Sequence, residues 1–148
     1  MLVVSKLVYR LAGTWLGIAE QRRVDAFQNY CLRRILKIPA AYYYRVRNVE
    51  VLDKAAQEPL SSTILKMQLR FFGQIFRLPT SDPLRTATFF GQGLRPATAG
   101  FVRKPGRPRH TWAEQLLKHA ARVAGNENLE QRMHNEELWR RMVQAYTF

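Results

Sequence analysis

The clearest helical pattern in this chain is residues 61–78, SSTILKMQLRFFGQIFRL. Uncharged side chains recur there at spacings of three and four residues, which places them on one face of an α-helix. The side chains expected to face inward are Ile64, Gln68, Phe71, Phe72, Ile75 and Phe76. Gly73 lies in the middle of this helix at a cost of about 1 kcal/mol relative to alanine. We therefore expect another backbone to approach Gly73 closely.

A second helical pattern precedes this stretch. An apolar stripe runs from Ala19 to Ile38 and stops before Pro39, which cannot continue a helix. Its members are Val24, Phe27, Cys31, Ile35 and Ile38. Asn48 is then expected to cap a helix of about two turns. The apolar side chains of that short helix are Val49, Leu52 and Ala55.

The C-terminal part of the chain begins with a pattern typical of a helix start. Thr111 and Glu114 have the spacing of a capping box, in which each side chain accepts a hydrogen bond from the other residue's backbone amide. The helix is expected to end at Ala124, because Gly125 suits the cap position that follows. One or two shorter helices come next and carry Leu138, Trp139 and Met142.

A segment rich in glycine and proline divides the predicted helices into two groups. Residues 91–108 hold four glycines and three prolines, a density that defeats regular structure. We predict an all-α protein in three parts: a small helical bundle over residues 1–90, a basic Gly/Pro-rich linker over 91–110, and a C-terminal helical lobe over 111–148. No alternating run of strand length competes with these helices.

The chain is strongly basic, with 24 Lys and Arg against 11 Asp and Glu and a net charge of +13. A polyanion is therefore the expected partner, and RNA or DNA is favoured over an anionic membrane surface. Positive charge is concentrated in residues 1–38, in 61–78 and in the loop before Thr111, whereas 111–148 is neutral. The residues predicted to contact nucleic acid are Arg22, Arg23, Arg33, Arg34, Lys66, Arg70, Arg77, Arg103, Lys104, Arg107 and Arg109.

Residue patterns that support catalysis are lacking in this sequence. It has no closely spaced Asp pair to hold the metal ions of phosphoryl transfer, and Glu136 and Glu137 point in different directions on a predicted helix. The three histidines lack the spacing of a helical metal site, and the lone Cys31 excludes a cysteine-based zinc cluster or an internal disulfide. We therefore expect no enzymatic activity, no cofactor and no metal in this chain.

The N-terminal residues bear on the expected compartment. No run in the chain reaches the roughly 20 uncharged apolar residues of a membrane-spanning helix. Residues 1–19 contain no acid, but no small-residue cleavage pattern follows them, so a buried first helix is favoured over a presequence or a membrane-surface helix. We expect an intracellular protein, nuclear or cytoplasmic, that is neither secreted nor bound to a membrane.

Two short segments offer further contacts to nucleic acid. Residues 103–109, RKPGRPR, form an extended Arg-Pro strip that resembles an AT-hook core and is narrow enough to enter a minor groove. A basic linker that follows phosphates without base preference is an equal alternative. Residues 42–44 are three tyrosines, which together with Arg45 and Arg47 can stack on single-stranded bases. An aromatic hinge packed between helices is the favoured interpretation of those tyrosines.

Several short motifs, taken in order, resemble a known family. They are Lys6-Leu7-Val8-Tyr9, Gly13-Thr14-Trp15, Leu32-Arg33-Arg34-Ile35-Leu36, Asn48-Val49-Glu50-Val51-Leu52, Leu69-Arg70-Phe71-Phe72-Gly73-Gln74 with Arg77, and Gly106-Arg107-Pro108-Arg109 before Trp112. Their order and spacing, over roughly residues 6–125, resemble the segment that follows the polymerase palm in LINE-type (non-LTR) retrotransposon reverse transcriptases.

The resemblance implies the thumb helices and the following linker of an RNA-directed DNA polymerase, with a grip on template RNA, primer or target DNA. The family's paired catalytic aspartates lie upstream of this segment, so the remainder of a reverse transcriptase is an expected partner. Family members usually carry histidine where this chain has Gln74. A stand-alone AT-hook-like DNA-binding protein and an inert translated remnant of a transposable element are the alternative interpretations.

Overall fold

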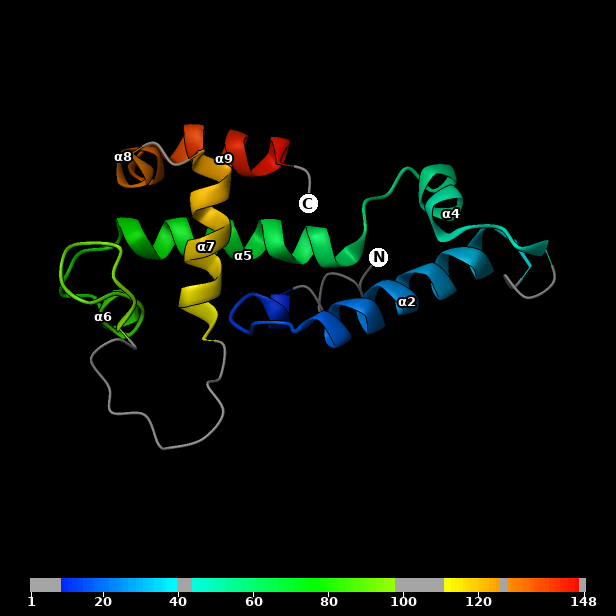
Figure 1. Cartoon of the computed structure of the whole chain (residues 1–148), viewed down its shortest axis with the longest axis horizontal. Helices are drawn as coiled ribbons and strands as arrows, with labels where there is room; N and C mark the ends of the chain where they lie inside the picture. Colours follow the sequence, from blue (N-terminus) through cyan, green and yellow to red (C-terminus); the bar gives the residue numbers. More distant parts are fainter. Residues whose placement is uncertain (1–8, 40–43, 98–110, 126–127, 147–148) are drawn as a thin grey trace, which may run out of the picture. The chain divides into compact units, whose positions relative to one another are not determined.

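The computed structural model describes residues 9–39, 44–97, 111–125 and 128–146. Within these ranges the regular structure is helical, apart from an isolated antiparallel bridge between Phe89 and Pro96. The helical content confirms the predicted all-α class. Figure 1 labels the helices as they are named below. Their bounds are α2 Ile18–Ile35, α4 Asn48–Lys54, α5 Leu60–Arg77, α6 Pro83–Thr88, α7 Trp112–Ala124, α8 Leu129–His134 and α9 Glu136–Ala145.

The chain divides into two compact units. One comprises residues 16–65, and the other comprises residues 1–15 together with 66–148. This division differs from the predicted one, which separated 1–90 from 111–148. The difference arises because the helices after residue 111 pack on the second half of α5, within one unit. Most of the predicted linker, residues 98–110, lies outside the described residues.

In the 16–65 unit, side chains of α2 cap the start of α5. The carboxylate of Asp25 accepts hydrogen bonds from the backbone amide of Ser61 at 2.8 Å and from its hydroxyl at 2.7 Å. The amide oxygen of Gln28 accepts from the backbone N–H of Leu60 at 2.7 Å, and its nitrogen donates to the carbonyl of Glu58. The first amides of a helix have no partner within the helix, so these contacts fix α5 against α2.

The packed side of α2 is polar, which corrects the predicted apolar stripe. Phe27 and Ile35, both placed on that stripe, are 44% and 74% exposed, whereas Asn29 and Arg33 are buried. The Arg33 guanidinium donates to the carbonyls of Pro39 and Val46 and to the side-chain oxygen of Asn48. Backbone carbonyls and helix amides face this side of α2, so polar side chains rather than apolar ones are buried there.

The short helix α4 has a different N-cap residue from the predicted one. Arg47 is its N-cap, and Asn48 is its first helical residue, with a side chain that accepts from Arg33. Of its apolar side chains, Val51 is fully buried and Val49 is 65% exposed.

The core of the other unit forms around α5. From residue 66 onward, the predicted inward side chains of this helix are buried, except that Phe71 is half-buried, and Leu69 joins them; Ile64 is buried in the 16–65 part of the chain. The rings of Phe72 and Phe89 lie 5.0 Å apart between centroids, and Phe72 also meets Trp112 edge-on. In Figure 1, α7 crosses α5 and α9 runs beside it. The buried partners from α7, α8 and α9 are Leu116, Ala120, Met133, Trp139 and Val143.

Gly73 allows the close approach of Trp139. A Cβ atom at Gly73 would lie 2.5 Å from the indole nitrogen of Trp139, nearer than side chains tolerate. That nitrogen donates a hydrogen bond of 3.0 Å to the carbonyl of Leu69, so the nitrogen-bearing edge of the indole packs against the helix. A close approach at Gly73 was predicted, but the neighbour is a side chain rather than a backbone.

The ends of α7 test two further predictions. Gly125 caps its C-terminus in the left-handed region, with φ 65°, and the helix ends at Ala124, as predicted. Thr111 is the N-cap, but its side chain makes no capping hydrogen bond, so that half of the predicted capping box is wrong. The Thr111 hydroxyl is instead buried.

The segment before Leu16 belongs to the α5 unit. The side-chain amide of Gln68 donates to the carbonyls of Leu11 at 2.8 Å and Thr14 at 2.7 Å. The indole of Trp112 donates to the carbonyl of Ala12 at 3.0 Å. The two bonds from Gln68 explain why a glutamine occupies the buried face of α5.

Candidate nucleic-acid interface

The side of α2 opposite its packed face carries basic and aromatic side chains together. Arg23, Phe27, Tyr30 and Arg34 follow one another at spacings of four, three and four residues, which places them on one helical face. All four are exposed, Phe27 by 44% and Tyr30 by 57%. The Arg34 guanidinium lies 5.4 Å from the centre of the Tyr30 ring. We call these four residues the α2 basic–aromatic face.

The α2 basic–aromatic face carries only positive charges, those of Arg23 and Arg34. Asp25 is the only acid between Arg23 and Arg34, and its carboxylate lies on the packed side, hydrogen-bonded to Ser61. Glu20, one turn before Arg23, is the nearest acid along α2 on the exposed side. A polyanion approaching the α2 basic–aromatic face therefore meets guanidinium groups and ring surfaces without an intervening carboxylate.

Several predicted contact residues lie elsewhere. Arg22 is exposed on α2, beside the α2 basic–aromatic face. Arg33 is only 9% exposed, and its guanidinium is held inside the 16–65 unit by three hydrogen bonds. Lys66 is 8% exposed, although we expected it off the buried face of α5. Burial therefore keeps most of the Arg33 and Lys66 side chains away from solvent.

Arg70 and Arg77 are half-buried on α5, where they line a cavity together with residues of α9. The remaining predicted residues, in the loop 103–109, lie outside the described residues, as do Tyr42 and Tyr43. Tyr44 is 71% exposed and is followed by exposed Arg45, so this tyrosine does not pack between helices as the hinge interpretation required.

Sequence reasoning missed Phe27 and Tyr30 as surface residues. Phe27 was placed in the core because its spacing to Cys31 and Ile35 fits an apolar stripe. A competing signal was present on the other side of the helix, where Asp25, Asn29 and Arg33 recur every four residues. Polar groups that recur in this way can be buried when backbone groups face them.

The described part of the chain offers neither a metal site nor a membrane-spanning helix. No group of three or more His, Cys, Asp or Glu side chains there could hold a metal ion. None of the described helices is long and apolar enough to cross a membrane. The pKa of the His119 imidazole is lowered, first by burial and then by the charge of Arg122. Its ring lies 5.6 Å from that of Trp15.

Comparisons with known proteins identify no family for the chain. No family model matches it, and neither a curated protein nor a solved structure matches it. A function is therefore inferred from the chain's own residues and their geometry.

Proposed function

We propose that this chain binds RNA and DNA without sequence preference. Guanidinium groups contact phosphates, and the exposed rings of α2 stack on unpaired bases. The observation that carries the proposal is the α2 basic–aromatic face, where two exposed arginines flank two exposed aromatic rings on the side of the helix away from Asp25. The net charge of +13 supports it, because counterion release drives non-specific binding of basic proteins to nucleic acids.

The dimensions of the face suit a nucleic-acid strand. Arg23 and Arg34 are eleven residues apart in an unbroken helix, which corresponds to about 16 Å along its axis at 1.5 Å per residue. Phosphates of one strand of a duplex are spaced by about 3.4 Å along its axis, so the face spans roughly five of them. Aromatic rings between the two charges can stack on bases of a single strand, an interaction that is tolerant of sequence.

We further propose that the chain derives from the segment after the palm of a LINE-type reverse transcriptase, an RNA-directed DNA polymerase. The ordered sequence motifs support this origin. On this proposal the chain grips template, primer or target nucleic acid, in the nucleus or cytoplasm, and polymerisation depends on the palm of the parent enzyme. A stand-alone AT-hook-like DNA-binding protein and an inert translated remnant are the competing hypotheses, and the binding experiment below separates the remnant from the other two.

The test is fluorescence anisotropy with labelled single-stranded and double-stranded oligonucleotides at several salt concentrations. We expect dissociation constants near 10⁻⁶ to 10⁻⁴ M at physiological salt and a steep loss of affinity as salt rises. The informative variant is Arg23→Gln with Arg34→Gln, which should weaken binding to every sequence and reduce the salt slope by about one unit for each lost phosphate contact. Phe27→Leu with Tyr30→Leu should weaken single-strand binding more than duplex binding.

The matched control is Lys118→Gln with Arg122→Gln. Both residues are exposed on α7 and lie four positions apart, and the two substitutions remove the same net charge as the α2 variant. None of the exposed large apolar residues of the described chain lies on α7. We expect the control to lose less affinity than the α2 variant. Binding that is absent or insensitive to salt would refute the proposal, and equal losses in the α2 variant and the α7 control would remove the α2 face as the site.

A further inference from the structure

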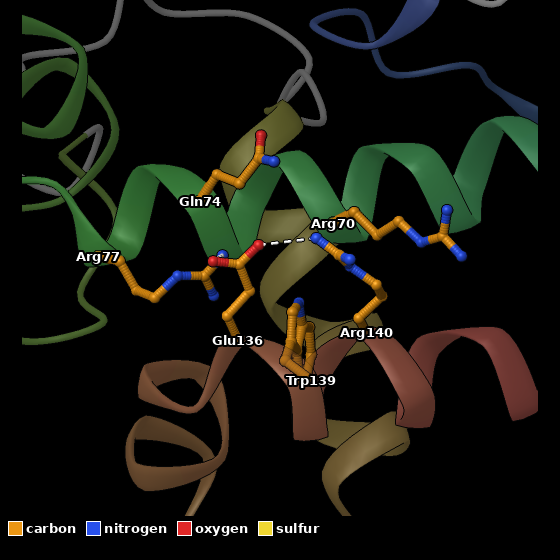
Figure 2. A pocket seen from close by; sticks show the side chains of 6 residues that line it. All are labelled: Arg70, Gln74, Arg77, Glu136, Trp139 and Arg140. Atoms are coloured by element: carbon orange, nitrogen blue, oxygen red, sulfur yellow. Dashed lines mark hydrogen bonds and ion pairs between the residues drawn. The ribbon is translucent and has the colours of Figure 1, made fainter.

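We propose that the cavity between α5 and α9 is a binding site for a phosphate monoester. Its volume is about 290 Å³, and it is lined by residues from two helices of the same unit (Figure 2). Small-molecule sites begin at roughly this size, so the cavity suits a phosphate with a small attached group rather than a large cofactor. The lining residues are Arg70, Gln74, Arg77, Glu136, Trp139 and Arg140.

The charges of this cavity favour a dianion. It holds three guanidinium groups and one carboxylate, a net charge of +2. A phosphate monoester carries about −1.5 to −2 at neutral pH, whereas an internal phosphodiester carries about −1. A tetrahedral phosphate also presents several oxygens, so arginines that approach from different sides can each contact a separate one.

The arginines are held in place by protein contacts that leave further N–H donors for a ligand. One terminal nitrogen of Arg77 donates to the carbonyl of Met133 at 2.8 Å, and the other lies 3.8 Å from Glu136. Arg70 donates to the side-chain oxygen of Gln144. Each guanidinium has five N–H donors, so these contacts orient the group without using all of its capacity.

Arg70 has one N–H donor that no acceptor in the described part of the protein satisfies. Its Nε atom is buried and has no hydrogen-bond partner among the described residues. A buried donor without an acceptor is costly, and a bound anion is one of the ordinary explanations for such a group. Gln74, one turn further along α5, also lines the cavity, and its exposed amide can donate to a phosphate oxygen or accept from an ester hydroxyl.

The carboxylate of Glu136 competes with a bound phosphate for the arginines of the cavity. Its carboxylate lies 2.8 Å from Arg140 and 3.8 Å from Arg77, so it already neutralises part of the charge that a phosphate would meet. Figure 2 shows the Glu136–Arg140 pair at the cavity. Removing this carboxylate should therefore strengthen phosphate binding, an outcome that a purely structural role of the pair does not predict.

The experiment is isothermal titration calorimetry of the full chain with inorganic phosphate, methyl phosphate and dimethyl phosphate. We expect saturable binding of the first two, with a dissociation constant on the order of 1 mM, and weaker binding of the diester. Glu136→Gln should raise the affinity about two- to fivefold, as expected for a partly exposed charge. Its matched control is Glu137→Gln, which removes the same charge from an acid that pairs with Arg141 and does not line the cavity.

Two arginine variants complete the test. Arg77→Gln should reduce affinity about tenfold or more, because a charged hydrogen bond is lost. Since Arg77 also bonds Met133, Arg140→Gln provides a milder variant: the Arg140 side chain is 63% exposed, and its guanidinium pairs with Glu136. The proposal is overturned if phosphate does not bind saturably, if Arg140→Gln leaves the affinity unchanged, or if Glu136→Gln and Glu137→Gln act alike.

The source of the phosphate is identified by a second pair of ligands, one oligonucleotide with a 5′-phosphate and the same strand with a 5′-hydroxyl. A strand end as ligand predicts tighter binding of the phosphorylated form, and a loss of that difference in Arg140→Gln. A free phosphate or mononucleotide as ligand predicts equal binding of the two strands. The site itself stands or falls with inorganic phosphate, independently of nucleic-acid binding by α2.

Discussion

Replacing Gly73 by alanine tests whether the indole of Trp139 determines the packing of α5. Two effects oppose each other. Alanine is favoured over glycine in a helix by about 1 kcal/mol, so the change would stabilise an isolated α5. In the folded unit, however, the new Cβ would lie 2.5 Å from the Trp139 nitrogen and 2.6 Å from the adjacent ring carbon. Packing therefore decides the sign of the effect.

The magnitude follows from the displacement that the ring requires. To reach an ordinary contact distance of roughly 3.5 Å, the indole must retreat by about 1 Å. Overpacking of this kind costs about 1–3 kcal/mol. The retreat also lengthens the 3.0 Å hydrogen bond to the Leu69 carbonyl, at a position where Trp139 is 1% exposed and water is excluded. After subtraction of the helix propensity gain, we expect a net loss of about 2 kcal/mol.

Thermal unfolding followed by circular dichroism measures this loss. A protein of this size loses roughly 2–4 °C in Tm per kcal/mol, so Gly73→Ala should lower Tm by about 4–8 °C. Gly13→Ala is the matched control in the same unit, because nothing lies within 4 Å of a Cβ atom there, and it should leave Tm nearly unchanged. An unchanged or raised Tm for Gly73→Ala would show that the indole is free to move and would refute the packing argument.

Three further predictions concern other residues. Arg33→Ala should lower the free energy of unfolding in urea by about 2–4 kcal/mol, because buried acceptors lose their donor, whereas exposed Arg34→Ala should change it by less than about 0.5 kcal/mol. Because the pKa of His119 is lowered in the folded state, the unfolded chain takes up a proton at this histidine first as pH falls. The free energy of unfolding should therefore decrease from pH 7 to pH 5, and it should decrease less in His119→Gln. Arg107→Ala with Arg109→Ala should weaken nucleic-acid binding at unchanged Tm; a uniform loss in anisotropy titrations indicates phosphate contacts, and a lost preference for A·T-rich duplex indicates minor-groove insertion.

The parts of the fold that were predicted correctly depend on local sequence. The inward face of α5 and the left-handed cap at Gly125 follow from helical periodicity and from the steric freedom of glycine. Periodicity failed on α2 because apolar spacing identifies a face only when the partner is apolar. There the partner is a set of carbonyls and helix amides, so Asp25, Asn29 and Arg33 turn inward and Phe27 is exposed.

The candidate sites were predicted only in part for a similar reason. Charge identified Arg23, Arg34, Arg70 and Arg77 as candidates, but it does not distinguish a buried guanidinium from an exposed one. The cavity requires α5 to meet α9, whose residues lie some sixty positions away in the sequence, and Arg140 was not a candidate because its region is neutral overall. Side chains brought together over such separations are fixed by tertiary packing.

The bonds that tie residues 11–14 to α5 and α7 affect how the chain folds during synthesis. They join positions 54, 57 and 100 residues apart, so the unit that contains α5, α7 and α9 is interrupted in sequence by the whole 16–65 unit. Contacts between distant positions slow folding, because long loops must close first. On a ribosome, the 16–65 unit is complete while α7 has still to be made, and the carbonyl of Ala12 has no partner until Trp112 emerges. Deleting the first fifteen residues would spare the early-folding unit and leave the buried amide of Gln68 without its two acceptors in the late one.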